Sequence, residues 1–251
     1  MIRAMIFDLD GTLVQTERLK SLSYARAAVE LCPHTLSEAE VAEAFEDVVG
    51  LPRWEVAQSL VERFDLEEKA RSRTAEFGVS APWQAFVQVR LRHYERMMAD
   101  PDVLRANQWP HNLALLREAR QSGCKTALAT MSRCQQARHV LEVLGLTEAF
   151  DFVATRDDVE HGKPAPEIYQ LVARELDIPP PESLVIEDSP SGVKAALAAK
   201  MWCIAVTTPL TRRRIHALQL LAERWIVDDP ATLTAVVRQM VAERKQDPKL
   251  L

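Results

Sequence analysis

Two aspartates that directly follow a short apolar run are the feature that most constrains this chain. The run Met5-Ile6-Phe7 has the length of a strand buried on both faces, and it ends in Asp8-Leu9-Asp10-Gly11-Thr12. In an open parallel sheet, ligands bind outside the carboxyl ends of the strands, so both carboxylates are expected at that edge. Two acids this close repel each other, and a hard divalent cation is their natural partner.

A structural turn and a calcium-binding loop are the two other interpretations of this stretch. Asp and Gly favour turns, so an Asp-x-Asp-Gly sequence alone can be purely structural. A calcium loop would continue with further oxygen ligands and a closing Glu, whereas Gly11 is followed by Thr-Leu-Val-Gln. A calcium loop is therefore excluded. The stretch on its own fits both a structural turn and a functional site, and residues elsewhere in the chain are needed to distinguish them.

Composition excludes several classes of partner. The formal net charge of -5 gives no bulk attraction to nucleic acid or anionic lipid, so an anionic substrate must be met by local cations. We expect no membrane partner, because no apolar run approaches the ~18 residues of a membrane span. The four cysteines are scattered, which favours isolated thiols over a zinc site or disulfides. The chain enters its first strand without a signal peptide, which predicts a cytoplasmic protein, and we expect a monomer.

From Thr16 to about residue 100 the pattern is helical throughout. Thr16 is a candidate N-cap, and Ser37 with Glu40 forms a capping box. Helices are expected over Glu17–Leu31, from Ser37 to about Val49, over Arg53–Phe64 and from Pro82 to about Met98, with residues 67–76 forming another helix or a loop. Because no strand interrupts this region, we predict an inserted all-α cap domain over residues 16–100.

From Pro110 onward, strands and helices alternate. Strands are expected over Lys125–Thr130, Phe152–Thr155, Ser183–Ile186, Cys203–Val206 and Trp225–Val227, with helices between them. This alternation predicts an α/β fold with a doubly wound parallel sheet, a Rossmann-like core built from residues 1–15 and 101–251.

Polar side chains follow several of these strands. Asp8 and Asp10 follow the first strand, Thr130 and Ser132 follow another, and Glu187-Asp188 ends a third. Lys163 begins a loop on the same side of the sheet. Each residue alone has an ordinary structural explanation, such as a helix cap or a surface lysine. Together they provide carboxylates for a metal, and a hydroxyl and an ammonium for a phosphate.

The order and spacing of these residues resemble the haloacid dehalogenase-like hydrolase superfamily. The four matching motifs are Asp8-Leu9-Asp10-Gly11-Thr12, Thr130, Lys163 in Gly-Lys-Pro-Ala-Pro-Glu, and Glu187-Asp188-Ser189-Pro190-Ser191-Gly192. The resemblance covers nearly the whole chain and is closest to the β-phosphoglucomutase-like branch, which includes many small-molecule phosphatases. It implies a Mg²⁺-dependent phosphatase that acts on a small phosphorylated metabolite, with a sugar phosphate as the expected substrate. A β-phosphoglucomutase-type hexose-phosphate mutase is the alternative.

The resemblance also implies a role for each core residue. Asp8 would be the nucleophile that forms an aspartyl-phosphate, and Asp10 the general acid and then the general base. Mg²⁺ would be bound by Asp8, by the backbone carbonyl of Asp10 and by Asp188, with Glu187 in support. Thr130 and Lys163 would hold the phosphoryl oxygens. Dehalogenases of the superfamily lack the second aspartate, so Asp10 favours phosphoryl transfer.

The expected substrate contacts rest on weaker similarities. Gly50-Leu51-Pro52-Arg53 matches the Gly-x-x-Arg loop by which the branch contacts its substrate, so Arg53 is a candidate for a second anionic group; an exposed arginine at a helix start is the alternative. Ser132-Arg133 resembles the Ser-Lys pair that meets a distal phosphate in the mutases. Lys20 stands where the mutases carry a histidine, which argues against mutase activity.

The chain departs from the pattern of the family at two further places, and two other classes of protein are alternatives to an enzyme of this family. Gln15 replaces a common aspartate in the segment that links core and cap, and Lys200-Met201 replaces a more usual glycine-containing turn. A signalling receiver domain also uses Asp, Thr and Lys, but its acidic pair and its phosphorylated aspartate lie on different strands. A binding protein without catalysis is disfavoured because every catalytic position of the family is filled.

Overall fold

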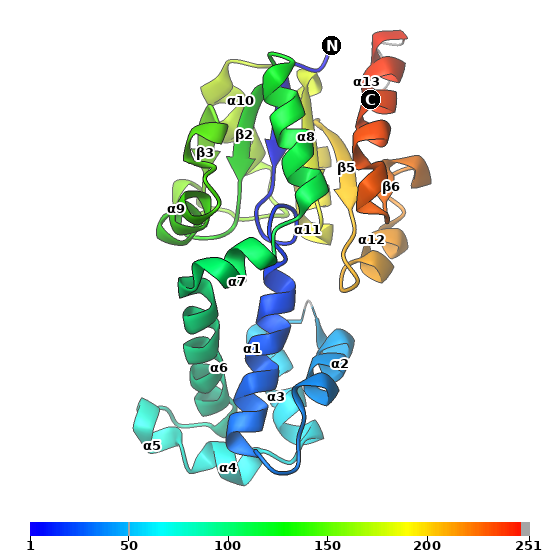
Figure 1. Cartoon of the computed structure of the whole chain (residues 1–251). Coiled ribbons are helices and arrows are strands. Elements are labelled where there is room, and N and C mark those ends of the chain that lie inside the picture. Colours follow the sequence, from blue (N-terminus) through cyan, green and yellow to red (C-terminus); the bar gives the residue numbers. More distant parts are fainter. Residues whose placement is uncertain (50, 247–251) are drawn as a thin grey trace. The chain divides into compact units, whose positions relative to one another are not determined.

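A parallel sheet organises the larger part of the molecule (Figure 1). The computed structural model describes residues 1–49 and 51–246, and within them the sheet has six strands in the order β3-β2-β1-β4-β5-β6, with every pairing parallel. The strands are β1 (Ala4–Phe7), β2 (Lys125–Ala129), β3 (Phe152–Ala154), β4 (Ser183–Glu187), β5 (Trp202–Val206) and β6 (Ile226–Val227).

This strand order identifies where a ligand is expected. The order reverses between β1 and β4, and in doubly wound sheets the crevice at that switch point, outside the carboxyl ends of the strands, is the binding site. It also differs from the 2-1-3-4-5 order of flavodoxin-like proteins, to which receiver domains belong. The predicted doubly wound α/β fold is therefore confirmed, and the receiver alternative is not supported.

The central strand is buried as its sequence predicts. Ile6 and Phe7 have no exposed surface and Met5 is 6% exposed. Phe7 lies opposite Leu128 of β2 and Ile186 of β4, so these three strands end at the same level.

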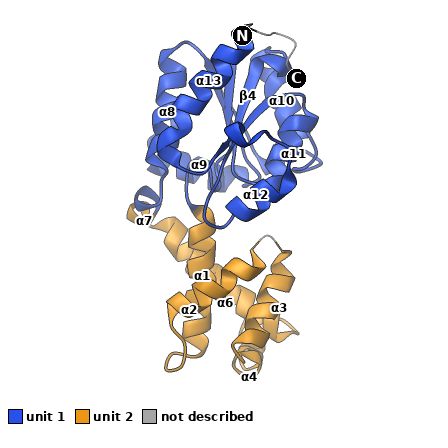
Figure 2. Ribbon diagram, turned by 90° about the vertical axis from the view of Figure 1, so that its right-hand side faces the viewer, with its two compact units in different colours: residues 1–15, 104–251 blue, residues 16–103 orange. Residues whose placement is uncertain are grey.

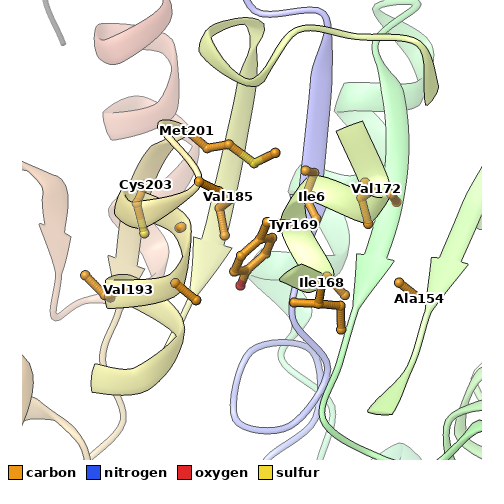
Figure 3. Close-up of a cluster of buried hydrophobic side chains, with 14 of the residues drawn as sticks. Ile6, Ala154, Ile168, Tyr169, Val172, Val185, Val193, Met201 and Cys203 are labelled. Atoms are coloured by element: carbon orange, nitrogen blue, oxygen red, sulfur yellow. The ribbon is translucent and has the colours of Figure 1, made fainter. Parts of the chain in front are cut away.

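Helices cover both faces of the sheet (Figure 1). On one side α8 contacts β2 and α13, and on the other α10 and α11 contact each other and pack on β2, β3, β4 and β5. Figure 3 shows part of the core under α10 and α11, with Tyr169 among Ile6, Val185 and Ile168. The helices of this part are α8 (Pro110–Gln121), α9 (Cys134–Val143), α10 (Glu167–Leu176), α11 (Pro190–Ala198), α12 (Arg212–Leu218) and α13 (Leu233–Gln246).

The chain forms two compact units (Figure 2). Unit 1 comprises residues 1–15 and 104–251, and unit 2 comprises residues 16–103. Unit 2 is entirely helical in its described residues, and the capping box of Ser37 and Glu40 begins its second helix as predicted. Its helices are α1 (Thr16–Leu31), α2 (Glu38–Val48), α3 (Arg53–Arg63), α4 (Glu67–Arg71), α5 (Thr74–Phe77) and α6 (Pro82–Ala99), and α7 (Pro101–Ala106) spans the boundary with unit 1.

Three details differ from the sequence prediction. Thr16 is the first residue of α1 and not its N-cap. Helix α7 was not predicted because Pro101 was interpreted as a helix end, although proline is equally favoured at a helix start. Helix α12 was also missed, because three consecutive arginines leave it only a short apolar face. None of the described helices has the length and apolar character needed to cross a membrane.

The loop after β1 folds back on itself and so keeps the two aspartates in place. The amides of Leu13 and Val14 donate to the carbonyl of Leu9, and the Gly11 amide donates to the carbonyl of Val14 at 2.7 Å. Gly11 has φ +86°, and a Cβ added there would lie 2.0 Å from Asp188 Oδ2. Only glycine therefore fits this position, both for its backbone conformation and for its closeness to a buried carboxylate.

The turn after α11 contains a non-glycine residue in a left-handed conformation. Lys200 has φ +59°, a left-handed conformation that costs a non-glycine residue about 1–2 kcal/mol. We expect Lys200→Gly to stabilise the protein by up to about 1 kcal/mol, because the relief of strain is partly offset by the greater freedom of glycine in the unfolded chain. Chemical denaturation monitored by circular dichroism measures the difference.

The control is Lys194→Gly, the same change at an exposed position inside α11, the helix that precedes this turn. There it should destabilise the protein by about 1 kcal/mol, the usual cost of glycine within a helix. Destabilisation by both variants would show that the conformation of Lys200 carries no relievable strain.

Candidate active site

The predicted polar residues of unit 1 meet at the carboxyl ends of three neighbouring strands. Asp8 follows β1, Thr130 follows β2, and Glu187 is the last residue of β4 and precedes Asp188. All four are buried, with exposed fractions between 0% and 5%. This is the switch point of the sheet, where the strand order predicts a ligand.

The ammonium group of Lys163 joins these strands. Its Nζ donates to Asp8 Oδ1 at 2.7 Å, to Glu187 Oε1 at 2.6 Å and to the backbone carbonyl of Ala129 at 2.9 Å. The Lys163 side chain is only 2% exposed. An ammonium has three donors, so this one is fully used and its position is fixed from three directions.

The loop that carries Lys163 is held by the charged residues on either side of it. The guanidinium of Arg156 donates to the carbonyls of Val159 and Glu160, at 2.6 and 3.3 Å. The Glu167 carboxylate accepts from the amides of Glu160 and His161, at 2.7 and 2.8 Å. These contacts fix the backbone just before Lys163, so the lysine is presented by an ordered loop.

The charges at this edge do not balance. Asp8, Glu187 and Asp188 have oxygen atoms within 4.8 Å of one another, and Lys163 contributes one positive charge among them. Burial is the largest influence on Asp8 and raises its pKa to about 8; Glu187 and Asp10 act in the same direction, and Lys163 opposes them. Burial lowers the pKa of Lys163, but Asp8 and Glu187 outweigh it and hold that pKa well above its usual value.

A divalent cation fits this residue set. Carboxylate oxygens are the preferred ligands of Mg²⁺, and two positive charges would match the two uncompensated negative charges. Such a cation would also favour the ionised form of Asp8, which burial disfavours in its absence. Gly11 leaves the space that the Asp188 carboxylate occupies. The chain thus has an acidic cluster suited to metal binding.

Asp10 is held by two hydroxyl groups of the β2–α9 connection. Ser132 Oγ donates to Asp10 Oδ2 at 2.5 Å, and Thr130 Oγ1 donates to the same oxygen at 3.4 Å. Thr130 Oγ1 also accepts from the Ser132 amide at 3.0 Å, which ties the two residues together. Ser132, expected from the sequence to contact substrate, therefore contacts the second aspartate in this structure.

The remaining predicted residues lie elsewhere. Arg133 is exposed at the N-cap position of α9 and forms no ion pair with the described residues. Lys20 and Arg53 belong to unit 2, where Lys20 lies on α1 and Arg53 begins α3. Gly50, the first residue of the predicted Gly-x-x-Arg loop, lies outside the described residues.

Unit 2 contains a second notable arginine that sequence reasoning missed. Arg90 of α6 is 6% exposed, and its guanidinium lies over the rings of Tyr24 and Tyr94, 5.0 and 4.6 Å from their centroids. Burial lowers its pKa, and the positive charge of Arg53 acts in the same direction, so the two arginines are near each other. Neither forms an ion pair within residues 1–49 and 51–246, whereas five other arginines of unit 2 do: Arg26, Arg63, Arg71, Arg73 and Arg92.

Comparisons with known proteins agree with this geometry. A family model described as haloacid dehalogenase-like hydrolase matches residues 2–200. The phosphorylated carbohydrates phosphatase of Thermotoga maritima is 30% identical over 79% of this chain and 82% of its own length. The fructose-1-phosphate phosphatase of Escherichia coli strain K12 is 28% identical over 80% of this chain and 95% of its own.

A solved structure extends the comparison to ligands. CbbY from Rhodobacter sphaeroides in complex with phosphate has a TM-score of 0.62 and 26% identity, over 93% of this chain and 96% of that one. A second structure, of a CbbY mutant, contains xylulose-(1,5)bisphosphate, with the same TM-score and identity, over 92% and 96% of the two chains.

The charge imbalance predicts that a divalent cation stabilises the protein. We expect millimolar Mg²⁺ to raise the unfolding temperature by a few degrees, because a ligand at about ten times its dissociation constant adds about 1.4 kcal/mol. Asp188→Asn should remove most of this shift, since it takes one negative charge and one strong ligand from the cluster. Thermal unfolding with and without Mg²⁺ measures the effect.

Glu182→Gln is the control, because Glu182 is a carboxylate of the same unit that pairs with Arg3 on the surface. It should keep the full Mg²⁺ shift. An equal shift in wild type and Asp188→Asn would exclude Asp188 as a ligand.

Proposed function

The chain belongs to the haloacid dehalogenase-like hydrolase family, in the branch of β-phosphoglucomutase-like and CbbY-like phosphatases, and from that premise we propose that it is a Mg²⁺-dependent phosphatase of a small phosphorylated metabolite, a sugar phosphate in particular. The observation that carries the proposal is the Lys163 ammonium held between Asp8 and Glu187 beside Asp188. It supports the proposal because Asp8, Lys163 and Asp188, which would serve as nucleophile, phosphate-binding cation and metal ligand, belong to one buried cluster.

Asp8 is proposed to attack the phosphorus of the substrate. One carboxylate oxygen forms the new bond to phosphorus while the bond from phosphorus to the leaving oxygen breaks, which gives an aspartyl-phosphate and an alcohol. The hydrogen bond from Lys163 to Oδ1 fixes the orientation of the carboxylate before the attack. Burial raises the pKa of Asp8 to about 8; Lys163 and, when bound, Mg²⁺ would favour the ionised form that attacks.

Asp10 is proposed to move the proton in both halves of the reaction. In the first half it donates a proton to the leaving oxygen, and in the second half it accepts one from the water that attacks the aspartyl-phosphate. That attack breaks the bond between phosphorus and Asp8 and releases inorganic phosphate. Ser132 and Thr130 both bond to Asp10 Oδ2, so they set the direction in which this carboxyl group faces.

Charge on the phosphoryl group has to be balanced during transfer. Lys163 supplies a fixed positive charge, and the Thr130 hydroxyl is a candidate donor to a phosphoryl oxygen. Mg²⁺, when bound, would lower the repulsion between Asp8 and the incoming phosphate. Asp8, Asp188 and the backbone carbonyl of Asp10 are the proposed ligands, with Glu187 in support.

Replacing the nucleophile tests the proposal directly. We expect wild type to hydrolyse p-nitrophenyl phosphate with Mg²⁺, and Asp8→Asn to lower kcat by at least about 10³-fold, because an amide cannot form the covalent intermediate. Nitrophenolate release measures the rate. Asp157→Asn, which changes a carboxylate that accepts from the Cys134 amide at the start of α9, should stay within about twofold of wild type.

Substantial turnover by Asp8→Asn would contradict the assignment of the nucleophile. Phosphorus NMR of a reaction with β-glucose 1-phosphate and a bisphosphate activator distinguishes the two enzyme candidates. Release of inorganic phosphate supports the phosphatase, and conversion into another hexose phosphate without that release supports the mutase.

The non-reacting part of the substrate is proposed to carry a second anionic or strongly polar group. Arg53 and Arg90 lie near each other, and no carboxylate in the described part of the chain forms an ion pair with either of them. The relatives' reported substrates and ligands, phosphorylated carbohydrates, fructose 1-phosphate and xylulose-(1,5)bisphosphate, fit this expectation.

Arg53→Ala should therefore affect a sugar bisphosphate more than a small ester. We expect kcat/KM for a sugar bisphosphate to fall about 10- to 100-fold, the range for a lost hydrogen bond to a charged group, while that for p-nitrophenyl phosphate changes less than about twofold. Steady-state kinetics with both substrates measures the difference. Arg63→Ala, at the far end of α3, should change neither value, and an equal loss with both substrates would remove Arg53 from the specificity site.

A further inference from the structure

Glu187 is saturated with hydrogen bonds. Its Oε1 accepts from Lys163 Nζ at 2.6 Å and from the Tyr169 hydroxyl at 3.1 Å. Its Oε2 accepts from the amides of Asp188 and Ser189, both at 2.9 Å, and from the Ser189 hydroxyl at 3.0 Å. A carboxylate offers about four lone-pair sites, so a cation could bind Glu187 only at the expense of one of these contacts.

The surroundings of Glu187 are built to keep its carboxylate still. Glu187 has no exposed surface. A Cβ added to Gly192 in the first turn of α11 would lie 1.7 Å from Oε1, so the helix backbone closes one side of the group. Glu187 is therefore the buried counter-ion of Lys163, and its filled hydrogen-bond sites make it poorly suited to bind a metal.

Tyr169 contacts both residues of this ion pair. It has no exposed surface and belongs to α10, in the core cluster drawn in Figure 3. The Lys163 Nζ lies 5.1 Å from the centroid of its ring, where the ring face attracts a cation. Its hydroxyl supplies the second bond to Glu187 Oε1. One side chain therefore contacts both members of the Lys163–Glu187 pair.

The sequence pattern does not reveal this role. Tyr169 is one of four buried residues along α10 (Ile168, Tyr169, Val172 and Ala173), a spacing typical of a helix face that packs on a sheet. A phenylalanine would fill the same space in the core. The hydroxyl is the atom that packing does not require.

We propose that Tyr169 is a positioning residue of the phosphatase reaction, which acts through Glu187 to hold the Lys163 ammonium against Asp8. The inference rests on the proposed function, because Lys163 serves there as the cation that meets the phosphoryl group. Tyr169 itself contacts no substrate. Its hydroxyl should therefore affect the rate of phosphoryl transfer more than substrate binding.

The test is Tyr169→Phe, which removes the hydroxyl and keeps the ring. We expect kcat with p-nitrophenyl phosphate to fall about 3- to 15-fold, with KM within about twofold, as for a lost hydrogen bond to a charged group that acts at one remove. The control is Thr126→Val, which removes a similarly buried hydroxyl bond, from Thr126 Oγ1 to the carbonyl of Ala149, at the opposite end of β2. It should leave both constants unchanged even if it lowers stability by a similar amount.

A second measurement does not depend on activity. Protein labelled with ¹⁵N-lysine should show a slowly exchanging ammonium signal, assigned to Lys163 by its absence from Lys163→Arg. We expect Tyr169→Phe to shift this signal or broaden it by faster exchange with water, and Thr126→Val to leave it unchanged.

The outcomes distinguish a failure of the positioning role of Tyr169 from a failure of the proposed phosphatase function. An unchanged kcat, a change confined to KM, or an unchanged ammonium signal in Tyr169→Phe each overturns the positioning role. A wild-type protein without phosphatase activity overturns the proposed function instead. In that case the ammonium signal alone decides whether the Tyr169 hydroxyl holds Lys163.

Discussion

The Lys163 ammonium between Asp8 and Glu187 is the interaction on which the site depends. It joins the ends of β1, β2 and β4 through Asp8, the Ala129 carbonyl and Glu187, all within 2.9 Å. The parallel strands bring these groups together regardless of the sign of their charges. Without a cation the carboxylates would repel one another. The lysine compensates only part of the negative charge. A buried site left negative in this way can bind a divalent cation and, through it, a phosphate dianion.

Two glycines show how closely the backbone approaches these carboxylates. Gly11 follows the second aspartate of the first motif, and an added Cβ would lie 2.0 Å from Asp188 Oδ2; at Gly192 the corresponding distance to Glu187 Oε1 is 1.7 Å. Glycine weakens a helix by about 1 kcal/mol, yet Gly192 lies in the first turn of α11. Gly11 and Gly192 are therefore explained by the room that the acidic side chains need, and of these two only Gly11 also requires a positive φ.

The core of the site was predictable because it depends on topology. Once the strands are recognised, their carboxyl ends must share one edge, and Asp8, Thr130, Glu187 and Asp188 come together without knowledge of any side-chain rotamer. Tyr169 and Arg90 were not predictable, because both lie on helix faces whose spacing is that of ordinary core residues. The groups that contact these two side chains depend on how each helix is rotated about its axis and how closely it packs. The spacing of apolar residues in the sequence does not determine either. Ser132 was assigned to the substrate from resemblance, whereas the local turn directs its hydroxyl to Asp10.

Arg90 has an environment that stability alone does not explain. A buried guanidinium is expected to have a carboxylate partner. The other arginines of unit 2 that form ion pairs do so at the surface, where an ion pair contributes little to stability. Arg90 instead lies against two tyrosine rings, with Arg53 near enough to oppose its charge. The aromatic faces offset part of the desolvation cost and leave the positive charge unneutralised. Such a charge is useful to a protein that binds an anion, because the ligand then supplies the missing counter-ion. In unit 1 the unbalanced buried charge has the opposite sign and suits a cation. The ligands proposed for the two units, an anion and a divalent metal, would each match the sign of the charge that they neutralise.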